Sequence, residues 1–315
     1  MSRPVIIDTD PGRDDAIAIL LALASPDELD VRAIVTVAGN VPLGLTERNA
    51  RQICELAGRS DIPLFRGCAA PIERPLVTAP HIHGHTGLAG PILPEPTMRS
   101  RDGGVDYLIE TLSACAPGSV TLCTLGPLTN LATALARKPD IAGAIAELVM
   151  MGGAHFAGGN VTPVAEFNVH VDPEAADLVL RTLSLAKVPV AMVPLDLTHT
   201  VLSTPARIAA LRAVDTACAR AVVQILEATG YNFAKYGRPG APLHDPCVIA
   251  YLLAPALFGG RHVNVEVETT SALTLGATVV DWWGVTGRAP NVTFLNQVDP
   301  EGVYQLLAQR LARLP

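Results

Sequence analysis

The chain carries little charge and no long hydrophobic run. Charged residues make up 17% of its 315 residues, and the net charge of −7 comes without a basic patch. This acidic balance argues against a nucleic-acid or other polyanionic partner. The longest apolar run, residues 16–24, is far too short to span a bilayer, so we expect no membrane partner. With 49% hydrophobic residues the chain can still build a large core.

Cysteine motifs and an export signal are missing as well. Residues 1–4 run directly into a strand-like segment and lack the apolar stretch of a signal peptide. No C-x-x-C pair or small-domain disulfide framework occurs among the six cysteines, which are Cys54, Cys68, Cys115, Cys123, Cys218 and Cys247. We therefore expect free, buried thiols in a cytoplasmic protein.

Short β-branched runs alternate with helical stretches along most of the chain. The expected strands are 5–7, 31–37, 120–123, 147–151, 188–193, 263–268 and 272–280. The expected helices are 45–57, 104–115, 128–136, 173–183 and 205–226. The pattern predicts an α/β fold with a mostly parallel, open, Rossmann-like sheet flanked by helices. The last two strands, separated by only Thr269-Thr270-Ser271, predict an added antiparallel hairpin, and the absence of a linker predicts a single domain over 1–315.

Four aspartates follow the first expected strand within eight residues. They lie at a strand-to-helix turn and are Asp8, Asp10, Asp14 and Asp15. Helix capping explains one or two of these carboxylates but not four. The helix N-terminus supplies only about half a positive charge, and one Arg13 cannot neutralise the rest. The cluster therefore favours a bound cation.

Other informative residues, glycine-rich or polar, also fall at the ends of expected strands. They include Gly39-Asn40, Leu125-Gly126, Gly152-Gly153 and Asp196. In open α/β sheets, ligands bind outside the carboxyl ends of the strands. We therefore expect these segments to converge on one cleft around the aspartates.

Three later segments add polar chemistry. Asn160, Glu166 and Asn168 lie in a Gly-rich loop and can hydrogen-bond a polyhydroxylated ligand, although ordinary loop capping explains them equally well. His244-Asp245 opens a helix, and Asp245 taken alone is more often a helix cap. The histidine-rich tract 80–87 resembles a metal-binding run, but its Gly and Pro predict a long mobile loop, and such a tract is weak support for zinc.

Taken together, these segments resemble the inosine-uridine-preferring nucleoside hydrolases. The opening Asp8-Thr-Asp10-Pro-Gly-Arg-Asp14-Asp15-Ala is similar to the signature of that family. The resemblance runs the length of the chain and includes Val37-Ala-Gly-Asn40-Val, His83-Gly-His-Thr-Gly-Leu88, Leu125-Gly-Pro-Leu-Thr-Asn130, Met151-Gly-Gly153, 160–168, Val171-Asp-Pro-Glu174 and His244-Asp245.

The resemblance implies one Ca²⁺ at the bottom of the cleft. By match, its protein ligands are Asp10, Asp15, the backbone carbonyl of Leu125 and Asp245. All are hard oxygen donors, which suit Ca²⁺ better than Zn²⁺. Asp8 then orients the turn rather than binding the metal.

The implied reaction is hydrolysis of the N-glycosidic bond of a ribonucleoside to ribose and free base, in nucleoside salvage and catabolism. Asp10 is the implied general base on a metal-bound water, and His244 the implied acid for the leaving base. The implied substrate contacts are Asp14 and Asn168 at the 2′-hydroxyl, Asn40 in the ribose site, Asn160 and Glu166 at the 5′-hydroxyl, and His83 near the base or 5′ side.

The chain departs from the family pattern where specificity is set. Arg13 occupies a position that is often apolar or Gln- or Asp-like in relatives, and its side chain is free to point away from the metal. The loop 229–240 is expected to cover the base, with Tyr231 and Tyr236 able to stack on a purine or a pyrimidine. The only tryptophans, 282 and 283, follow a late strand, so a purine held between tryptophans has little support. The resemblance also implies a homodimer or homotetramer.

Two other functions stay open on the sequence alone. A strand followed by Asp-x-Asp is also typical of aspartate-nucleophile phosphatases, in which Asp8 would be the nucleophile and Mg²⁺ the metal. Gly12 does not fit that pattern, which also assigns no role to 160–168 or to His244-Asp245. A non-catalytic nucleoside-binding protein is the second alternative, although it would have no need for Asp10 as a base.

Overall fold

The computed structural model describes residues 2–234, 237 and 239–315, with the backbone alone for 230–234. Within these residues, nine strands form one sheet in the order β10-β9-β11-β6-β5-β4-β1-β2-β3. The neighbouring strands from β3 to β11 pair in parallel, and β9 and β10 are added antiparallel. The predicted fold class, with its antiparallel hairpin, is therefore confirmed. The strands are β1 Arg3–Thr9, β2 Leu29–Thr36, β3 Leu64–Arg66, β4 Val120–Thr124, β5 Ile145–Met151, β6 Val190–Val193, β9 Phe258–Val267, β10 Thr278–Asp281 and β11 Val292–Val298.

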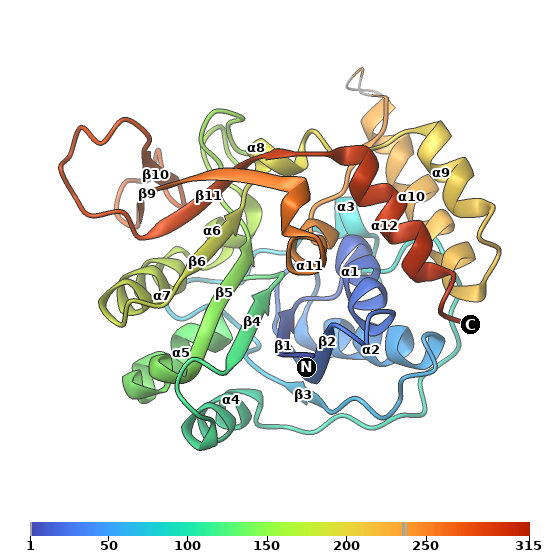
Figure 1. Cartoon of the computed structure of the whole chain (residues 1–315), viewed down its shortest axis with the longest axis horizontal. Helices are drawn as coiled ribbons and strands as arrows, with labels where there is room; N and C mark the ends of the chain where they lie inside the picture. The colour runs from blue at the N-terminus through green and yellow to red at the C-terminus, as the bar shows by residue number, and fades with distance from the viewer. Residues whose placement is uncertain (1, 235–236, 238) are drawn as a thin grey trace.

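Helices cover both faces of the sheet, because the strands are apolar on both sides. In β1, Val5 and Ile7 pack into one core cluster and Ile6 into the other, as the two-residue period of a strand requires. Figure 1 shows the two helical layers on opposite sides of the strands. One layer contains α1 Arg13–Leu23, α2 Leu43–Leu56, α10 Ala217–Ala234, α11 Pro246–Leu253 and α12 Pro300–Leu311. The other contains α4 Gly104–Ala114, α5 Thr129–Arg137 and α7 Pro173–Leu185.

Helix α1 lies at the centre of its layer. Ten of its eleven residues are buried, the exception being Asp14, because α2, α10, α11 and α12 surround it. A helix that is apolar on all sides is stable only when it is buried on all sides. The burial fixes the first turn of α1, and with it the predicted acidic cluster, in the interior of the protein.

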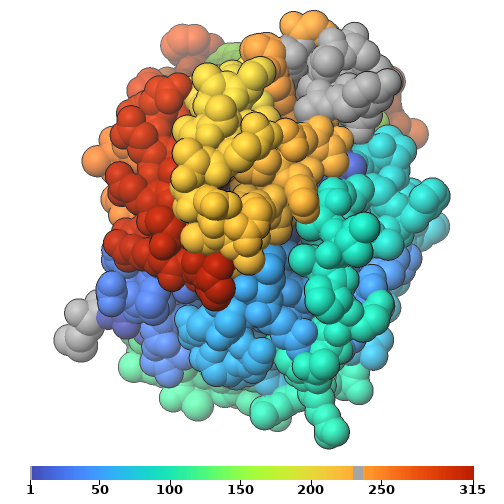
Figure 2. Space-filling view, turned by 90° about the vertical axis from the view of Figure 1, so that its right-hand side faces the viewer, coloured from blue at the N-terminus to red at the C-terminus, as the bar shows by residue number. Residues whose placement is uncertain are grey.

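Short elements complete the chain. They are α3 Pro80–His83, η1 Pro139–Ala144, α6 Phe167–Val171, α8 Leu195–Thr198, α9 Pro205–Arg212, η2 Pro255–Leu257, and the antiparallel pair β7 Leu202–Ser203 and β8 Ala241–Pro242. Figure 2 shows α9, α10 and α12 side by side, with the long connection after α3 running down the face next to them. That connection is tied to α2, where the side-chain amide of Gln52 donates to the carbonyls of Leu93 and Pro94.

The structure corrects several predicted elements. The predicted helix 205–226 is two helices, α9 and α10, separated at a turn in which Asp215 adopts a left-handed φ of 54°. The hairpin connection spans residues 268–277 rather than three residues, and residues 229–234, predicted as loop, extend α10. The predicted list lacked β3, β11 and α12. All six cysteines are free and four are buried, as expected for most of them, while Cys68 and Cys115 are half-buried. No helix within the described residues is both long and apolar enough to cross a membrane.

Candidate active site

The carboxylate of Asp15 stabilises the turn between β1 and α1. Asp15, in the first turn of α1, accepts hydrogen bonds from the Thr9 hydroxyl (2.6 Å) and from the backbone N–H of Gly12 (3.0 Å). The second bond satisfies one of the N–H groups left without a partner at a helix start. Residue 12 must be glycine, because a Cβ there would collide with the His83 ring and the Asn40 amide.

Asp10 lies just beyond the end of β1 and is fully buried. One carboxylate oxygen accepts the backbone N–H of Asn40 at 2.6 Å, while the other has no hydrogen-bond partner among the described residues. A side chain at Gly39 or Gly126 would collide with this carboxylate. Both positions therefore require glycine, which lets the loops after β2 and β4 pack closely around Asp10. Burial, together with the negative charge of Asp15, raises the pKa of Asp10 well above its ordinary value.

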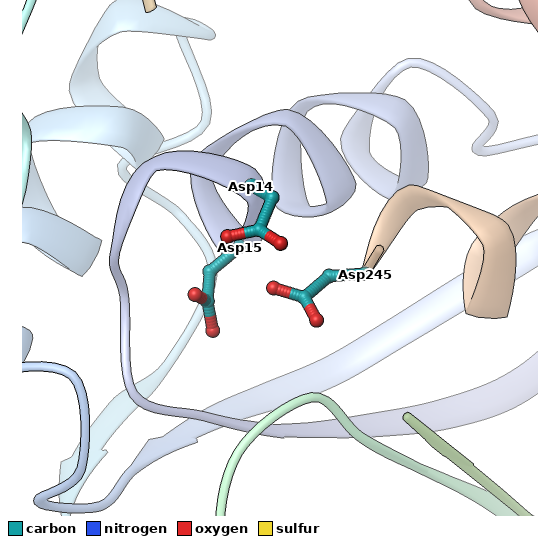
Figure 3. A group of neighbouring side chains, drawn as sticks. All are labelled: Asp14, Asp15 and Asp245. Carbon is teal, nitrogen blue, oxygen red and sulfur yellow. The ribbon is translucent and has the colours of Figure 1, made fainter. Parts of the chain in front are cut away.

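Three carboxylates meet directly beside Asp10. One oxygen each of Asp14, Asp15 and Asp245 lies within 4.8 Å of the others. Figure 3 shows Asp14 and Asp15 at the start of α1 facing Asp245 at the start of α11. Burial raises the pKa of Asp14 and Asp15 to about 6 each, and burial together with the neighbouring aspartates raises that of Asp245 well above its ordinary value.

This cluster fits a hard divalent cation. Its donors are all oxygens, and Asp10 contributes a buried oxygen with no partner among the described residues. Like charges held this close in a buried site are stable when a cation neutralises them. Asp245 is not merely a helix cap, because its side chain makes no capping hydrogen bond to α11. No histidine belongs to this group of potential ligands within the described residues.

Two asparagines expected at the ribose also hold the predicted metal ligands. The Asn40 side chain donates to Asp15 (3.0 Å) and to the backbone carbonyl of Asp10 (3.1 Å). The Asn168 side chain donates to the carbonyls of Leu125 (2.7 Å) and Met151 (3.2 Å). Both residues therefore fix the positions of ligand atoms as well as lining the cavity above them.

A cavity of about 470 Å³ opens above the cluster, which is a volume typical of small-molecule sites. Asp10 and Asp15 are buried and are not among the residues that line it. Predicted site residues that line it are Asp14, Asn40, His83, Leu125, Asn160, Glu166, Asn168, His244 and Asp245. The Tyr231 side chain and Tyr236 lie outside the described residues. Neither tryptophan lines the described cavity, Trp283 being 76% exposed and Trp282 packed against Phe294.

Glu166 is fully buried beside the cavity and caps α6. It accepts hydrogen bonds from the backbone N–H groups of Asn168 (2.8 Å), Val169 (3.1 Å) and Gly153 (3.0 Å). The capping alternative is therefore correct for this residue, although it does not exclude a ligand contact, since a carboxylate has about four acceptor sites. Burial raises the pKa of Glu166 to about 7.

The two predicted histidines differ in their surroundings. His83 lies in the short helix α3 rather than in a loop, and its Nδ1 accepts the backbone N–H of Arg13 at 3.2 Å. Burial and the positive charge of Arg13 lower the pKa of His83 to about 3, so this ring is neutral at physiological pH. His244 pairs through Nδ1 with the hydroxyl of Thr198 at 2.8 Å, and its ring centroid lies 5.9 Å from that of His199.

Sequence reasoning missed three residues around this site. Thr198 and His199 carry no local signal, because they reach His244 only after α8 has packed against the start of α11. Asn130 ends the segment 125–130 that resembles the family, but the sequence does not predict its role. Its side chain donates to Asp8 at 2.8 Å and accepts the backbone N–H of Cys68 at 2.7 Å. Asp8 is thereby bonded to Asn130 and does not belong to the group of three carboxylates.

The comparisons with known proteins establish the family of the chain. The model of the inosine-uridine preferring nucleoside hydrolase family matches residues 5–305, and the chain belongs to that family. It is 47% identical to an uncharacterized protein of Schizosaccharomyces pombe and 44% identical to the pyrimidine-specific ribonucleoside hydrolase RihA of Photobacterium profundum, each over 99% of both chains. A solved purine-preferring ribonucleoside hydrolase from Gardnerella vaginalis superimposes with a TM-score of 0.89 at 27% identity, over 98% of both chains. Nucleoside hydrolases are metal-dependent and act on N-glycosyl bonds.

The raised pKa values predict how pH affects the stability of the metal-free protein. A carboxyl whose pKa is higher folded than unfolded stabilises the fold below its unfolded value, near 4, and loses that contribution as pH rises through its folded value. The pKa is about 7 for Asp8 and Glu166 and well above its ordinary value for Asp10 and Asp245. The melting temperature of chelator-treated protein should therefore decrease as the pH is raised from 6.5 to 8. The lowered pKa of His83 makes stability increase with pH, but only below about pH 6.5.

Added Ca²⁺ should raise that melting temperature more at pH 8 than at pH 6.5, because protons and metal compete for the same oxygens. In the matched variant Asp245→Asn, both the fall with pH and the response to Ca²⁺ should shrink. Differential scanning fluorimetry checks both effects. A melting temperature that rises with pH in the metal-free protein, or that does not change when Ca²⁺ is added, would contradict the proposed metal site.

Proposed function

We propose that this protein hydrolyses the N-glycosidic bond of ribonucleosides in a Ca²⁺-dependent reaction that yields ribose and the free base, in nucleoside salvage and catabolism. The observation that carries the proposal is the group formed by the buried Asp15 and Asp245 and the half-buried Asp14 beside a cavity of nucleoside size. Uridine and inosine are both candidate substrates. The name of the RihA relative, which is pyrimidine-specific, favours uridine as the first substrate to test.

The proposed metal ligands are Asp10, Asp15, Asp245 and the carbonyl of Leu125. Their all-oxygen chemistry supports Ca²⁺ rather than a softer metal. When bound, the ion would supply positive charge that holds the ribose hydroxyls and favours ionisation of water. Asn40 and Asn168 support this assignment, because their side-chain amides orient two of these four groups, the Asp15 carboxylate and the Leu125 carbonyl, while the backbone N–H of Asn40 holds the Asp10 carboxylate.

Asp10 is the proposed general base. One of its oxygens is fixed by the Asn40 backbone, and the other has no hydrogen-bond partner within the described residues, so a lone pair is available to accept a proton. As the water oxygen bonds to C1′ of the ribose, Asp10 takes the water proton and the C1′–N bond breaks with its electron pair moving to the base. Because the carboxylate is already held in position before the substrate binds, less entropy is lost on reaching the transition state.

The remaining polar residues of the cavity are proposed to hold the sugar and the base. Asp14 and Asn168 would bind the 2′-hydroxyl, with Asn40 also in the ribose site. Asn160 and Glu166 would bind the 5′-hydroxyl. His244 would protonate the leaving base, and the bond between its Nδ1 and Thr198 supports this role by fixing the ring orientation. His83, which is neutral, would contact the base or the 5′ side, and Tyr231 and Tyr236 would stack on the base.

The alternative functions are not favoured. A phosphatase would need Asp8 as an exposed nucleophile, but Asp8 is 4% exposed, bonds to Asn130 and does not line the described cavity. A purely binding role has no use for the acceptor oxygen of Asp10. We also propose a cytoplasmic location and a homodimer or homotetramer. The six free cysteines support the first, and the exposed apolar residues Val279, Trp283 and Val285 near the β10 edge support the second.

A reducing-sugar assay over a panel of ribonucleosides tests the proposed function. Ribose release from uridine or inosine should fall at least about a hundredfold when a Ca²⁺ chelator is present and recover when Ca²⁺ is restored in excess. Release of phosphate from a phosphomonoester, with none of ribose from any nucleoside, would support the phosphatase alternative instead. Tight nucleoside binding without base release would support the binding protein.

A second prediction concerns the 2′-hydroxyl. Asp14 and the metal would both contact it, and a site built to bind a hydroxyl discriminates strongly against its absence. We expect 2′-deoxyuridine to be poorer than uridine by roughly three orders of magnitude in kcat/KM. Base release followed by ultraviolet absorbance checks this, and comparable turnover of the two nucleosides would refute the proposed sugar contacts.

A third prediction separates protonation of the base from the other steps. His244→Ala should slow uridine or inosine hydrolysis by ~10²–10⁴-fold, the usual loss of a general acid. The same variant should hydrolyse p-nitrophenyl riboside at nearly the parent rate, because p-nitrophenolate leaves without a proton. Equal losses on both substrates would assign His244 to sugar binding or structure rather than to acid catalysis.

A further inference from the structure

Arg13 is a buried cation in the wall of the cavity. It is the first residue of α1, is 7% exposed, and lines the cavity. Its Nη1 donates to the Thr229 hydroxyl on α10 at 3.3 Å, and its Nε is buried without a hydrogen-bond partner among the described residues. The guanidinium therefore points toward α10 and retains unused donors.

No carboxylate among the described residues forms a direct ion pair with this guanidinium, although the negative charge of the adjacent Asp14 acts on it. The ion pairs among the described residues do not include Arg13, and the residues outside that set contain neither Asp nor Glu. By contrast, the similarly buried Arg310 donates through both terminal nitrogens to Glu28. Buried N–H donors without an acceptor are costly, so the unused donors of a buried arginine that faces a cavity are best explained by an acceptor that arrives with the ligand.

The surroundings of Arg13 differ from those of the carboxylates at the cavity floor. Ile17 lies one turn further along α1, Ile225 lies one turn before Thr229 on α10, and both line the cavity. The neighbouring His83 is neutral, so Arg13 is the charged donor on this side. An apolar wall with one planar cation suits a flat heterocycle that carries a carbonyl group better than it suits a hydroxyl-rich sugar.

We infer that Arg13 donates a hydrogen bond to a carbonyl oxygen of the nucleobase and stabilises the negative charge that the base gains as it leaves. The inference rests on the proposed function and adds to it a residue that distinguishes bases. When the C1′–N bond breaks, its electron pair moves to the base nitrogen and spreads onto the conjugated carbonyl oxygen. The guanidinium keeps its protons throughout, and the proton that the base finally gains comes from His244.

The assignment has a consequence for specificity. Uracil, cytosine, hypoxanthine and guanine carry a carbonyl oxygen, whereas adenine has no carbonyl and carries, where hypoxanthine has its oxygen, an amino group that cannot accept a hydrogen bond from a guanidinium. Arg13 therefore selects for carbonyl-bearing bases and against adenine. A site that binds an acceptor through a buried donor rejects the analogue lacking it, because the donor is then left unpaired.

Product inhibition of the Ca²⁺-loaded enzyme tests the inference. The inhibition constants of uracil and ribose are measured against uridine hydrolysis for the parent, Arg13→Met and Arg13→Lys. Methionine keeps an unbranched stem and removes every N–H donor. The uracil constant should rise about tenfold or more in Arg13→Met, as expected for loss of a charged hydrogen bond, and less in Arg13→Lys. The ribose constant should stay within about twofold of the parent value, since the sugar contacts are untouched.

Arg310→Met is the matched control, because it removes a buried arginine that does not line the cavity. It should leave both constants unchanged even if it lowers stability. An unchanged uracil constant in Arg13→Met, or uracil and ribose constants that rise together, would overturn the inference. Matching losses in Thr229→Val and Arg13→Met would reassign Arg13 to tethering α10 to α1.

The same experiment distinguishes this inference from the proposed function. If the parent protein releases no ribose from any ribonucleoside, the proposed function fails, and calorimetric binding of uracil to the parent and Arg13→Met still tests the contact. If the parent is active and both proteins bind uracil equally well, the role of Arg13 fails while the hydrolase function stands.

Discussion

Mutual repulsion among buried carboxylates is the constraint on which this structure depends. Burial raises the pKa values of Asp10, Asp15 and Asp245, and the negative charge of neighbouring aspartates adds to the effect at each of them. The fold fixes Asp10 and Asp15 with donors that are themselves held in place, namely the Thr9 hydroxyl and the backbone N–H groups of Gly12 and Asn40. Parallel pairing brings these strand ends to one edge of the sheet, and the buried helix α1 fixes the first turn. A cation is the remaining component that such an arrangement calls for.

Much of the fold could be predicted because its strands are locally distinctive. The runs at 31–37 and 147–151 are rich in apolar or β-branched residues, which marks β2 and β5 before any contact is known. β3 is only three residues long, and the outer strands β9, β10 and β11 owe their register to partners far away in the sequence. The break between α9 and α10 depends on a left-handed aspartate, Asp215, where the local pattern reads as a continuous helix.

Part of the site could be predicted because its acidic residues lie unusually close together in the sequence. Four aspartates in eight residues indicate a cation site, and the family resemblance brings in Asp245. The sequence cannot show that Asp8 bonds to Asn130 while Asp14 and Asp15 face Asp245, because these contacts depend on the direction in which each side chain points in the folded protein. The contacts of Thr198 and Arg13 form only when the chain is folded. Thr198 bonds to His244, and Arg13 bonds to Thr229 on α10. Ordinary residue types in ordinary helices give no local signal of such roles.

The central claim is that one cation, held by carboxylates from the starts of α1 and α11, organises the active site. A crystal structure of the protein grown with Ca²⁺, with anomalous scattering used to locate the metal, tests it most directly. The account predicts a single ion that contacts carboxylate oxygens of Asp10, Asp15 and Asp245 and the carbonyl of Leu125, with Asp14 beside it facing the cavity. An empty acidic cluster, or an ion bound instead by the histidines of residues 81–85, would contradict the account.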